Sequence, residues 1–477
     1  MIIKNAEKLA SHSNINGRRI VLDILEAGFE ASDPYENARK LIRVDNGKLL
    51  FGHTDFEWQT SDKRSSGRPP FVFDLSEVGN IYVAGGGKAA QRMAKAVEDV
   101  LGDLITEGQI NAKKGEPRWC KRINVTFAGH PIPDEDSVEG SKEIVEILRK
   151  ADHDDLVIYA ASGGASALTT LPGPGLTLED LQEVNRLLFF ECGASMQETN
   201  AVRTTCLTIL NTKHLRYVGD ATCIYFLTSE VPPNLHRKDP RDPKSSGGTD
   251  AYQCAIDVLK RYQIWKKVPK SVCRYLKKAD PRYGPLRAEE VEGKPYYEFT
   301  VMDPHYMLDA AKGKAKELGL NAEIGVSSLN NVEVRPVAET IAYMAQEIDS
   351  HDRPLKPPCV LIFGGELLVA VGKSTGVGGR NQEFALWTAP MIDGRRNIVI
   401  ASADSDGTDG PTYVAGGIVD GRTMERVREA DIDIFRELDN HNSYAVLEKL
   451  DDHIITGARG TNVRDLRVVY IGTPSQG

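Results

Sequence analysis

Short, uninterrupted apolar runs alternate with amphipathic segments along the chain, and several of the runs end in a glycine-rich turn. Such runs predict buried strands, and the amphipathic segments between them predict crossover helices. The pattern is clearest at Ile81–Ala84, Leu156–Ala161, Cys223–Leu227 and Cys359–Phe363. This alternation predicts an α/β protein built around a mostly parallel sheet.

The amphipathic segments carry typical helix-start and helix-stop residues. Thr177 and Ser195 are predicted N-caps, because their hydroxyl groups can accept hydrogen bonds from the first turn of a helix. Gly102 is predicted to end the first crossover helix. The expected helices cover residues 89–100, 178–192, 251–264, 306–318, 337–348 and 381–391, and further strands are expected at 123–127, 367–371 and 397–402.

Glycine is the compositional excess, with 43 of 477 residues, and the net charge is −9. This charge gives no general attraction to nucleic acid or to an anionic membrane. The first residues lack a signal-peptide pattern, and no segment is apolar enough to span a bilayer. A cytoplasmic protein with a small-molecule partner is expected. The length fits three average domains or two large ones, and the polar segment 349–358 is the predicted linker.

The turn Gly85-Gly86-Gly87-Lys88 joins a predicted strand to a predicted helix. N–H groups at a helix start attract anions, and glycine allows a ligand to approach closely. Because Ala89 follows the lysine, the turn is not a Walker A loop. It matches the dinucleotide fingerprint loosely, but no acidic residue ends the predicted strand 123–127 to bind a ribose. The glycines therefore indicate either an anion site or tight strand-to-helix packing.

The segment Ser162–Ser166 follows the next strand in the same way. Neither serine has a glycine on both sides, as a nucleophile elbow requires. Phosphate binding by backbone and hydroxyl groups is the favoured role, with a serine helix cap as the alternative. Arg380 follows another glycine loop at a predicted helix start, where its guanidinium suits a carboxylate or phosphate. A salt bridge to Glu383 is its alternative role.

Carboxylates cluster after the predicted strand 397–402, at Asp404, Asp406 and Asp409. In that position they can hold Mg²⁺ or accept a proton from a hydroxyl group, although Asp/Gly clusters also form ordinary turns. Glu366, after two glycines, has the same two interpretations. His130 is a candidate base, but its place beside prolines favours a structural loop residue.

Together these motifs resemble the type II glycerate kinases, whose carboxyl-terminal half is called the MOFRL domain. The strings that carry the resemblance occur in the family's order: Gly85-Gly86-Gly87-Lys88-Ala89-Ala90, His130-Pro131-Ile132-Pro133-Asp134, Ser162-Gly163-Gly164-Ala165-Ser166-Ala167, Gly364-Gly365-Glu366, Gly378-Gly379-Arg380-Asn381-Gln382-Glu383, Asp406-Gly407-Thr408-Asp409-Gly410-Pro411-Thr412 and Thr456-Gly457-Ala458-Arg459-Gly460-Thr461-Asn462-Val463. They cover nearly the whole chain, so the set is far more specific than any one string.

The resemblance implies a two-domain α/β fold with the active site in the cleft between the domains. A larger Rossmann-like, parallel-sheet domain is expected at residues 1–350, with polar loops near 52–70 and 234–248. A smaller MOFRL-type α/β domain is expected at 351–477.

The implied activity is ATP-dependent phosphorylation of a small hydroxy acid, foremost D-glycerate to 2-phosphoglycerate, with Mg²⁺ or another divalent cation. Some family members carry a hydroxypyruvate reductase label. An NAD(P)H-dependent reductase is therefore an alternative, as is a kinase of a related C4 sugar acid. A homodimer is the assembly considered. The family's active-site lysine and arginine correspond to Lys88 and Arg380.

The candidate site residues come from the motifs and the resemblance together. Catalytic candidates are Lys88, Arg380 and Asp406; nucleotide-binding candidates are Gly86, Gly87, Ser162, Gly163, Gly164, Ser166, Gly378 and Gly379; substrate-binding candidates are Arg203, Arg380 and Asp409; metal-binding candidates are Glu230, Glu366 and Asp406.

Several positions depart from the family's pattern. Thr204-Thr205 stand where Lys-His is usual after Arg203, and Glu230 stands where an aspartate is usual. Gly248 replaces a usual proline, and Tyr413 replaces a usual acidic residue. Kinase chemistry is therefore more firmly predicted than specificity for glycerate.

Overall fold

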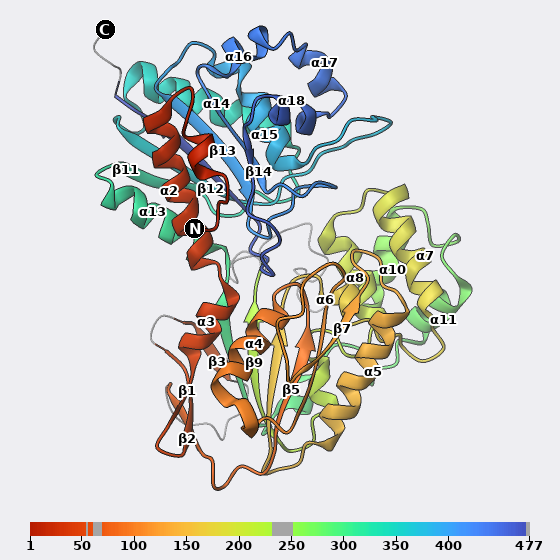
Figure 1. The fold of residues 1–477 in the computed structure, drawn as a ribbon. Helices are drawn as coiled ribbons and strands as arrows, with labels where there is room; N and C mark the ends of the chain where they lie inside the picture. Colours follow the sequence, from red (N-terminus) through yellow and green to blue (C-terminus); the bar gives the residue numbers. More distant parts are fainter. Residues whose placement is uncertain (54–55, 61–68, 231–250, 474–477) are drawn as a thin grey trace. The chain divides into compact units, whose positions relative to one another are not determined.

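The computed structural model describes residues 1–53, 56–60, 69–230 and 251–473 (Figure 1). The chain forms two compact units: unit 2 is residues 34–302, and unit 1 combines residues 1–33 with residues 303–477. The domain boundary expected after residue 350 thus falls inside unit 1. There the predicted linker only connects α14 (Val334–His351) to β12 (Cys359–Gly365). The expected loop at 234–248, with Gly248, lies outside the described residues, as does part of the loop at 52–70.

A seven-stranded sheet with the order β3-β10-β9-β8-β5-β6-β7 forms the centre of unit 2. Its strands are β3 (Trp58–Thr60), β5 (Ile81–Gly86), β6 (Glu107–Lys113), β7 (Asn124–Ala128), β8 (Leu156–Ala161), β9 (Thr222–Thr228) and β10 (Tyr296–Met302). Neighbouring strands pair in parallel except β3, which is antiparallel to β10. The expected parallel sheet is confirmed.

The order of these strands creates a switch point between β5 and β8. The chain lays β6 and β7 on one side of β5 and then returns to place β8 on its other side. The connections after β5 and β8 therefore leave in opposite directions along the sheet. Open α/β sheets bind their ligands at this point, beyond the carboxyl ends of the strands.

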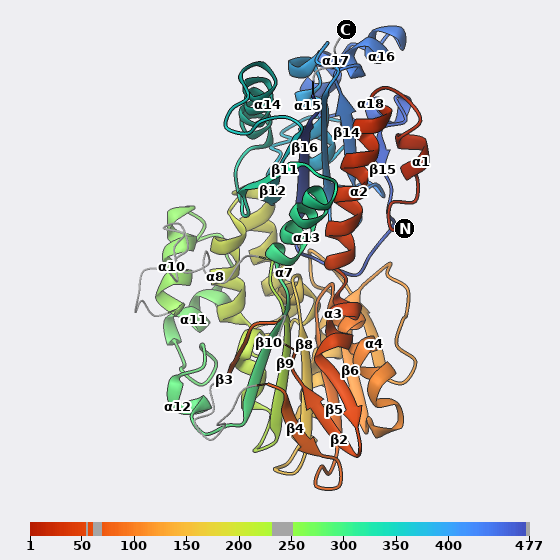
Figure 2. The same cartoon turned by 90° about the vertical axis from the view of Figure 1, so that its left-hand side faces the viewer.

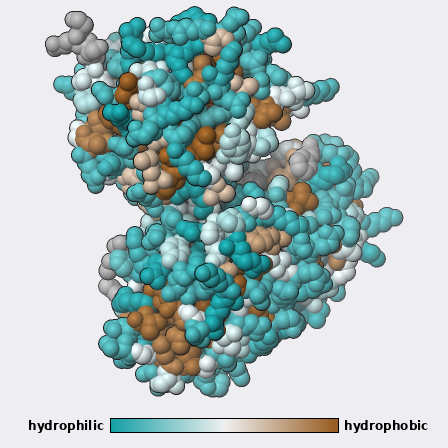
Figure 3. Space-filling view, viewed as in Figure 1, coloured by the Kyte–Doolittle hydropathy of each residue, from teal (hydrophilic) through white to brown (hydrophobic). Residues whose placement is uncertain are grey.

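Helices cover the sheet of unit 2. The predicted first crossover helix is confirmed as α4 (Ala90–Leu101), and α5 (Glu135–Lys150) begins with a capping box made by Asp134 and Ser137. Apolar residues of α5, including Ile144 and Leu148, share one core with Tyr82 of β5. A small antiparallel sheet of β1 (Ile42–Asp45), β2 (Lys48–Phe51) and β4 (Phe71–Asp74) follows α3 (Pro34–Leu41). Val44 and Val72 of this small sheet are exposed. Apolar patches are visible on the surface of the molecule (Figure 3).

A group of helices packs beside the carboxyl end of β8. It consists of α6 (Ala165–Leu168), α7 (Leu178–Arg186), α8 (Met196–Cys206), α10 (Ala251–Arg261) and α11 (Lys270–Lys278). The predicted caps Thr177 and Ser195 are confirmed, and each forms a capping box. The helix expected over 178–192 differs in one respect, because from Leu187 to Glu191 it continues as a π-helix.

Unit 1 contains a six-stranded mixed sheet, ordered β11-β12-β16-β13-β14-β15. Its strands are β11 (Asn321–Val326), β12, β13 (Ile398–Asp404), β14 (Gly416–Asp420), β15 (His453–Ile454) and β16 (Asp465–Ile471). Only β11 and β12 pair in parallel. The strand predicted at 367–371 is wrong, since that segment offers only an isolated bridge from Leu368 to Glu333.

Helices cover both faces of this sheet. The helices α2 (Ile15–Ala31) and α13 (Pro304–Glu317) lie side by side on one face (Figure 2). On the other face α14 and α15 (Arg380–Thr388) share an apolar core with strand residues such as Leu361 and Ile400. The remaining helices are α1 (Ala6–Leu9), α16 (Thr423–Glu429), α17 (Ile434–Asp439) and α18 (Ser443–Lys449).

A buried ion-pair cluster fastens α2 to the rest of unit 1. Arg18 is fully buried, and its Nε and Nη1 atoms lie 2.6 Å from carboxylate oxygens of Asp420 and Asp452 respectively. Burial acts to raise the pKa of Asp452, but Arg18, His12 and Arg426 together outweigh burial and leave that pKa below its usual value. The first 33 residues are thus an integral part of unit 1.

We expect Arg18→Met to lower the free energy of unfolding by about 3–5 kcal/mol, because it leaves two buried carboxylates short of a positive partner. Urea unfolding of the full chain measures this loss. Arg19→Met, at the exposed neighbouring position of α2, should change little. The depressed pKa of Asp452 stabilises the folded state only while its carboxyl group is ionised. The loss of unfolding free energy in Arg18→Met should therefore be complete above about pH 4 and become smaller at lower pH. Equal losses in the two variants would contradict the role of the cluster.

Candidate functional site

The turns that follow β5 and β8 meet at the switch point of unit 2. The N–H of Lys88 donates to the carbonyl of Gly163 over 2.9 Å, and the N–H of Ala89 donates to Ser162 Oγ over 2.9 Å. The N–H of Gly87 donates to the carbonyl of Asn111. These donors at the start of α4 are therefore engaged within the protein, which favours the packing interpretation for Gly86 and Gly87.

Close packing explains why glycine stands at position 87. A Cβ atom there would lie 2.2 Å from Ser162 Oγ, and its φ of +133° is one that L side chains rarely adopt. The turn after β5 can thus lie directly against the turn after β8. This contact fixes the backbone of Lys88 beside the segment Ser162–Ser166.

The segment Ser162–Ser166 has the open donors that the first turn lacks. Within the described part of the chain, no hydrogen-bond partner accepts from the N–H groups of Gly163, Gly164 or Ser166. His130 Nε2 and Lys88 Cγ lie 3.1 and 3.3 Å from the position that a Cβ of Gly164 would take. Open N–H groups next to a lysine form a favourable environment for an anion.

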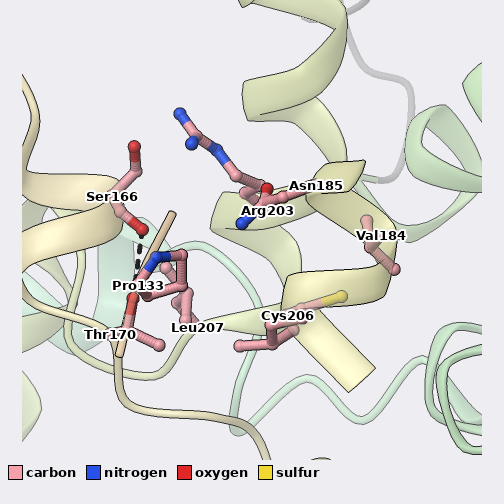
Figure 4. A pocket seen from close by; sticks show the side chains of 9 residues that line it. Pro133, Ser166, Thr170, Val184, Asn185, Arg203, Cys206 and Leu207 are labelled. Carbon is pink, nitrogen blue, oxygen red and sulfur yellow. Dashed lines mark hydrogen bonds between the residues drawn. The ribbon is translucent and has the colours of Figure 1, made fainter. Parts of the chain in front are cut away.

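A small pocket that opens to solvent lies beside this segment (Figure 4). Its lining residues come from the loop before α5 and from α6, α7 and α8: Pro133, Ser166, Thr170, Leu181, Val184, Asn185, Arg203, Cys206 and Leu207. Burial lowers the pKa of Arg203 to about 10, against the opposing effect of Glu230, so the side chain stays cationic at neutral pH. Burial also raises the pKa of the Cys206 thiol to about 12, which keeps it protonated and unreactive.

In unit 1, Arg380 is the centre of a second charged group. Its Nε and Nη2 atoms each lie 2.9 Å from a carboxylate oxygen of Asp465, and Nη2 lies 2.5 Å from Asp404. Glu366 is farther away, 3.4 Å from Nη1. Burial acts to lower the pKa of Arg380, but these carboxylates outweigh it and hold the pKa well above its usual value. Asp465 is shared with Arg467, 2.7 Å away.

Asp409 binds the amino terminus of α15. Its carboxylate accepts hydrogen bonds from the N–H groups of Asn381 and Gln382, at 3.1 and 2.9 Å, and the residue is fully buried. Burial raises its pKa, although Arg380 and these N–H groups oppose the shift. A Cβ at Gly379 would lie 2.3 Å from Asp409 Cγ, so this capping arrangement depends on glycine. The placement favours a structural role for Asp409 over contact with substrate.

The three metal-binding candidates are divided between the two units. Glu366 lies between Arg380 and Arg464, and Asp406 Oδ1 accepts hydrogen bonds from Thr408. Glu230 belongs to the other unit. Among the described residues, no group of three His, Cys, Asp or Glu side chains is placed to hold a metal ion. The charge of Glu366 is compensated by arginines, and the assignment of these three residues to a metal site stays a prediction.

Comparisons with known proteins agree with this architecture. A domain of unknown function, DUF4147, matches residues 20–277, and the MOFRL family matches residues 359–465. Glycerate 2-kinase of Pyrococcus horikoshii is 34% identical over 96% of this chain and 98% of its own length. The chain belongs to the glycerate 2-kinase family. D-glycerate 2-kinase of Thermotoga maritima is 37% identical over 81% of this chain and 89% of the relative.

The fold of the glycerate 2-kinase family is also known from solved structures. A crystal structure of glycerate kinase from Thermotoga maritima has a TM-score of 0.73 and 32% identity, and covers 95% of this chain and 99% of that one. A protein named putative hydroxypyruvate reductase, from Agrobacterium vitis, is 33% identical over 83% of this chain and 100% of its own length. The resemblance and the α/β fold class expected from sequence are confirmed.

The structure groups the family-like residues by unit. Unit 2 gathers Lys88, Ser162, Gly163, Gly164, Ser166 and Arg203 near its switch point. Unit 1 holds Glu366, Gly378, Gly379, Arg380, Asp406 and Asp409. Gly378 packs closely against Ser443 Oγ, which a Cβ would approach to 2.1 Å.

Sequence reasoning missed Asp465 and Asn185. Asp465 is a single acid at a strand start, with no local signal linking it to Arg380. Asn185 was detectable as a polar residue beside Leu181 and Val184 on an apolar helix face.

We expect Gly379→Ala to cost about 1–3 kcal/mol of unfolding free energy, because the added methyl group overlaps the carboxylate that caps α15. Thermal unfolding monitored by circular dichroism measures the loss. Gly313→Ala is the matched control: Gly313 lies within α13, and outside its own stretch of helix no atom of the described residues lies within 4 Å of the position that its methyl group would take. The control should gain about 0.5–1 kcal/mol. A Gly379→Ala protein as stable as the control would show that the close contact with Asp409 is unimportant.

Proposed function

We propose that the protein is an ATP-dependent kinase that phosphorylates D-glycerate at its 2-hydroxyl group. One observation carries the proposal: Lys88 is fixed beside the open N–H groups of Ser162–Ser166, at the switch point of a parallel sheet. A cation next to several N–H donors suits the oxygens of a transferring phosphoryl group. Membership in the glycerate 2-kinase family supports the choice of donor and acceptor.

In this proposal the protein contributes positioning and charge, as is usual in phosphoryl transfer. Lys88 neutralises charge on the moving phosphoryl group, while the N–H groups of Gly163, Gly164 and Ser166 bind its oxygens. Ser162, Gly86 and Gly87 act indirectly, by holding the two turns together. ATP is the donor, and we expect it as its Mg²⁺ complex, with the metal held mainly by nucleotide phosphates.

Arg380 and Asp406 keep the catalytic roles that the family resemblance implies. Asp465 and Asp404 occupy Nε and Nη2 of Arg380, so Nη1, with its longer 3.4 Å contact to Glu366, is the edge that we assign to an anionic ligand. Asp406, half-buried in the turn after β13, is the proposed base for an acceptor hydroxyl. Asp409 supports this region by capping α15.

A hydroxypyruvate reductase is the second candidate, because two named relatives carry that label. A dinucleotide site of the Rossmann type needs an acidic residue at the end of the strand after the glycine turn. That strand is β6, which ends Asn111-Ala112-Lys113. The absence of an acid at this end of β6 favours the kinase.

The departures from the family's pattern leave a C4 sugar acid as an alternative acceptor. Thr204 Oγ1 donates to the carbonyl of Asn200 within α8, next to Arg203. Tyr413 is exposed, and its hydroxyl pairs with that of Tyr444 at 2.9 Å. We propose a small-molecule substrate and a cytoplasmic location. No helix in the described ranges is long and apolar enough to cross a bilayer.

We expect Lys88→Met to reduce turnover at least about 100-fold, because it removes the positive charge beside the phosphate-binding segment. A coupled assay of ADP release with ATP, Mg²⁺ and a panel of C3 and C4 hydroxy acids measures this. Lys95→Met, farther along α4, is the control. Among the described residues, Lys95 pairs with Glu98 and Asp99 of its own helix, so this variant should retain activity. Thermal unfolding checks that both variants are folded.

Two outcomes of the same assay would contradict the proposal. Near-normal turnover of Lys88→Met would remove this lysine from the chemistry. Oxidation of NADH or NADPH with hydroxypyruvate, without ADP release from any acid, would establish the reductase instead.

A further inference from the structure

Two buried polar atoms in the pocket beside Ser166 have no hydrogen-bond partner within the described part of the chain. They are Nε of Arg203, a residue 6% exposed, and Oδ1 of Asn185, a residue 1% exposed. A buried donor or acceptor left unpaired costs free energy, so native proteins rarely keep one without a use. Both atoms belong to residues that line the same pocket.

The guanidinium of Arg203 is held in place from two sides. Its Nη2 donates to Asn200 Oδ1 over 2.7 Å, and its Cζ lies 5.1 Å from the centre of the Phe189 ring. Phe189 belongs to the π-helical stretch Leu187–Glu191, a type of distortion common at functional sites. In Figure 4 the guanidinium of Arg203 and the hydroxyl of Ser166 extend toward the same side of the pocket. A held cation with a free donor is suited to a carboxylate.

Asn185 offers a hydrogen-bond acceptor, Oδ1, where Arg203 offers a donor. Its neighbours in the pocket include Leu181, Val184 and Leu207, all buried and apolar. A leucine at position 185 would satisfy such surroundings better than an amide with an unpaired oxygen. Oδ1 can only accept, so its natural partner is a hydroxyl group of a ligand.

We infer that Asn185 and Arg203 form the acceptor-specificity pocket of this enzyme. Arg203, with Ser166, binds the carboxylate, and Asn185 Oδ1 accepts a hydrogen bond from the hydroxyl that is not phosphorylated. The pocket therefore selects short acids that carry a second hydroxyl group. Ser166 links the pocket to the proposed phosphate-binding segment. The inference rests on the proposed kinase function for its reaction but not for its binding chemistry.

The role of Arg203 is tested with D-glycerate and its neutral amide, glyceramide, as alternative acceptors. In Arg203→Met, kcat/KM for glycerate should fall about 10- to 100-fold, mostly through KM, whereas the value for glyceramide should change less than about threefold. Arg203→Lys keeps the charge and should retain more of the preference for glycerate. If both variants keep the wild-type glycerate-to-glyceramide ratio, Arg203 does not bind the carboxylate.

The role of Asn185 is tested with D-glycerate and D-lactate, which lacks the 3-hydroxyl group. Asn185→Leu should reduce the preference for glycerate over lactate about 10-fold or more, because the buried acceptor is gone. The same variant should melt at the same or a higher temperature, since an unpaired polar atom has been replaced by an apolar group. Lower stability with an unchanged preference would show that Asn185 is structural and overturn its role.

Arg186→Leu is the matched control for both tests, since Arg186 is adjacent in sequence, exposed, and paired with Glu183 on the same helix. It should leave both acceptor ratios unchanged.

Binding can also be measured without turnover, as the shift in melting temperature that each compound causes. A wild-type protein stabilised by glycerate but unable to release ADP would refute the kinase and keep the pocket. If the wild-type protein is a kinase but the Asn185 and Arg203 variants keep both acceptor ratios, the role of these two residues in acceptor specificity is wrong and the kinase function stands.

Discussion

The two hydrogen bonds between the turns after β5 and β8 are the contact on which the site in unit 2 depends. They join Lys88 and Ala89 to the segment Ser162–Ser166. Each turn alone is a common strand-to-helix connection. Bonded together, they give the lysine a fixed backbone and leave the second turn with its donors open. Glycine at position 87 makes this contact between the turns possible, because any side chain there would push the turns apart.

The charged residues of unit 1 obey a different constraint. Buried carboxylates and arginines are placed so that each is paired: Arg380 with Asp465 and Asp404, and Asp465 also with Arg467. Such a network is stable only while every member remains, since an unpaired buried charge is costly. Loss of activity on changing Arg380 would therefore mix catalysis with stability. In unit 2, Nε of Arg203 has no hydrogen-bond partner among the described residues. A substitution of Arg203 can therefore change activity with a smaller effect on stability than a substitution of Arg380.

Local patterns in the sequence predicted much of the fold. The runs that became β5, β8 and β9 are apolar throughout because both faces of a parallel sheet are buried. Strand β6 was missed because Gln109 and Asn111, although buried, are polar; they bond to Thr126 and to the carbonyl of Leu168. Lys88, Ser166 and Arg203 were recognisable as a set only through the family's order of motifs. Asp465, which pairs with Arg380, lies 85 residues farther along the chain, and no local pattern links the two residues.

The division of the chain has a consequence for its synthesis. Unit 2 is one continuous stretch, so it can complete its sheet as soon as residue 302 has left the ribosome. Helix α2 emerges earlier, yet its buried Arg18 must wait for Asp420 and Asp452, more than 400 residues later. The neighbouring helix α13 is complete at residue 317, but the charge of Arg18 does not have both carboxylates until residue 452 has been made. The amino-terminal helix is therefore made first, but its buried ion pairs are among the last contacts of the fold to form.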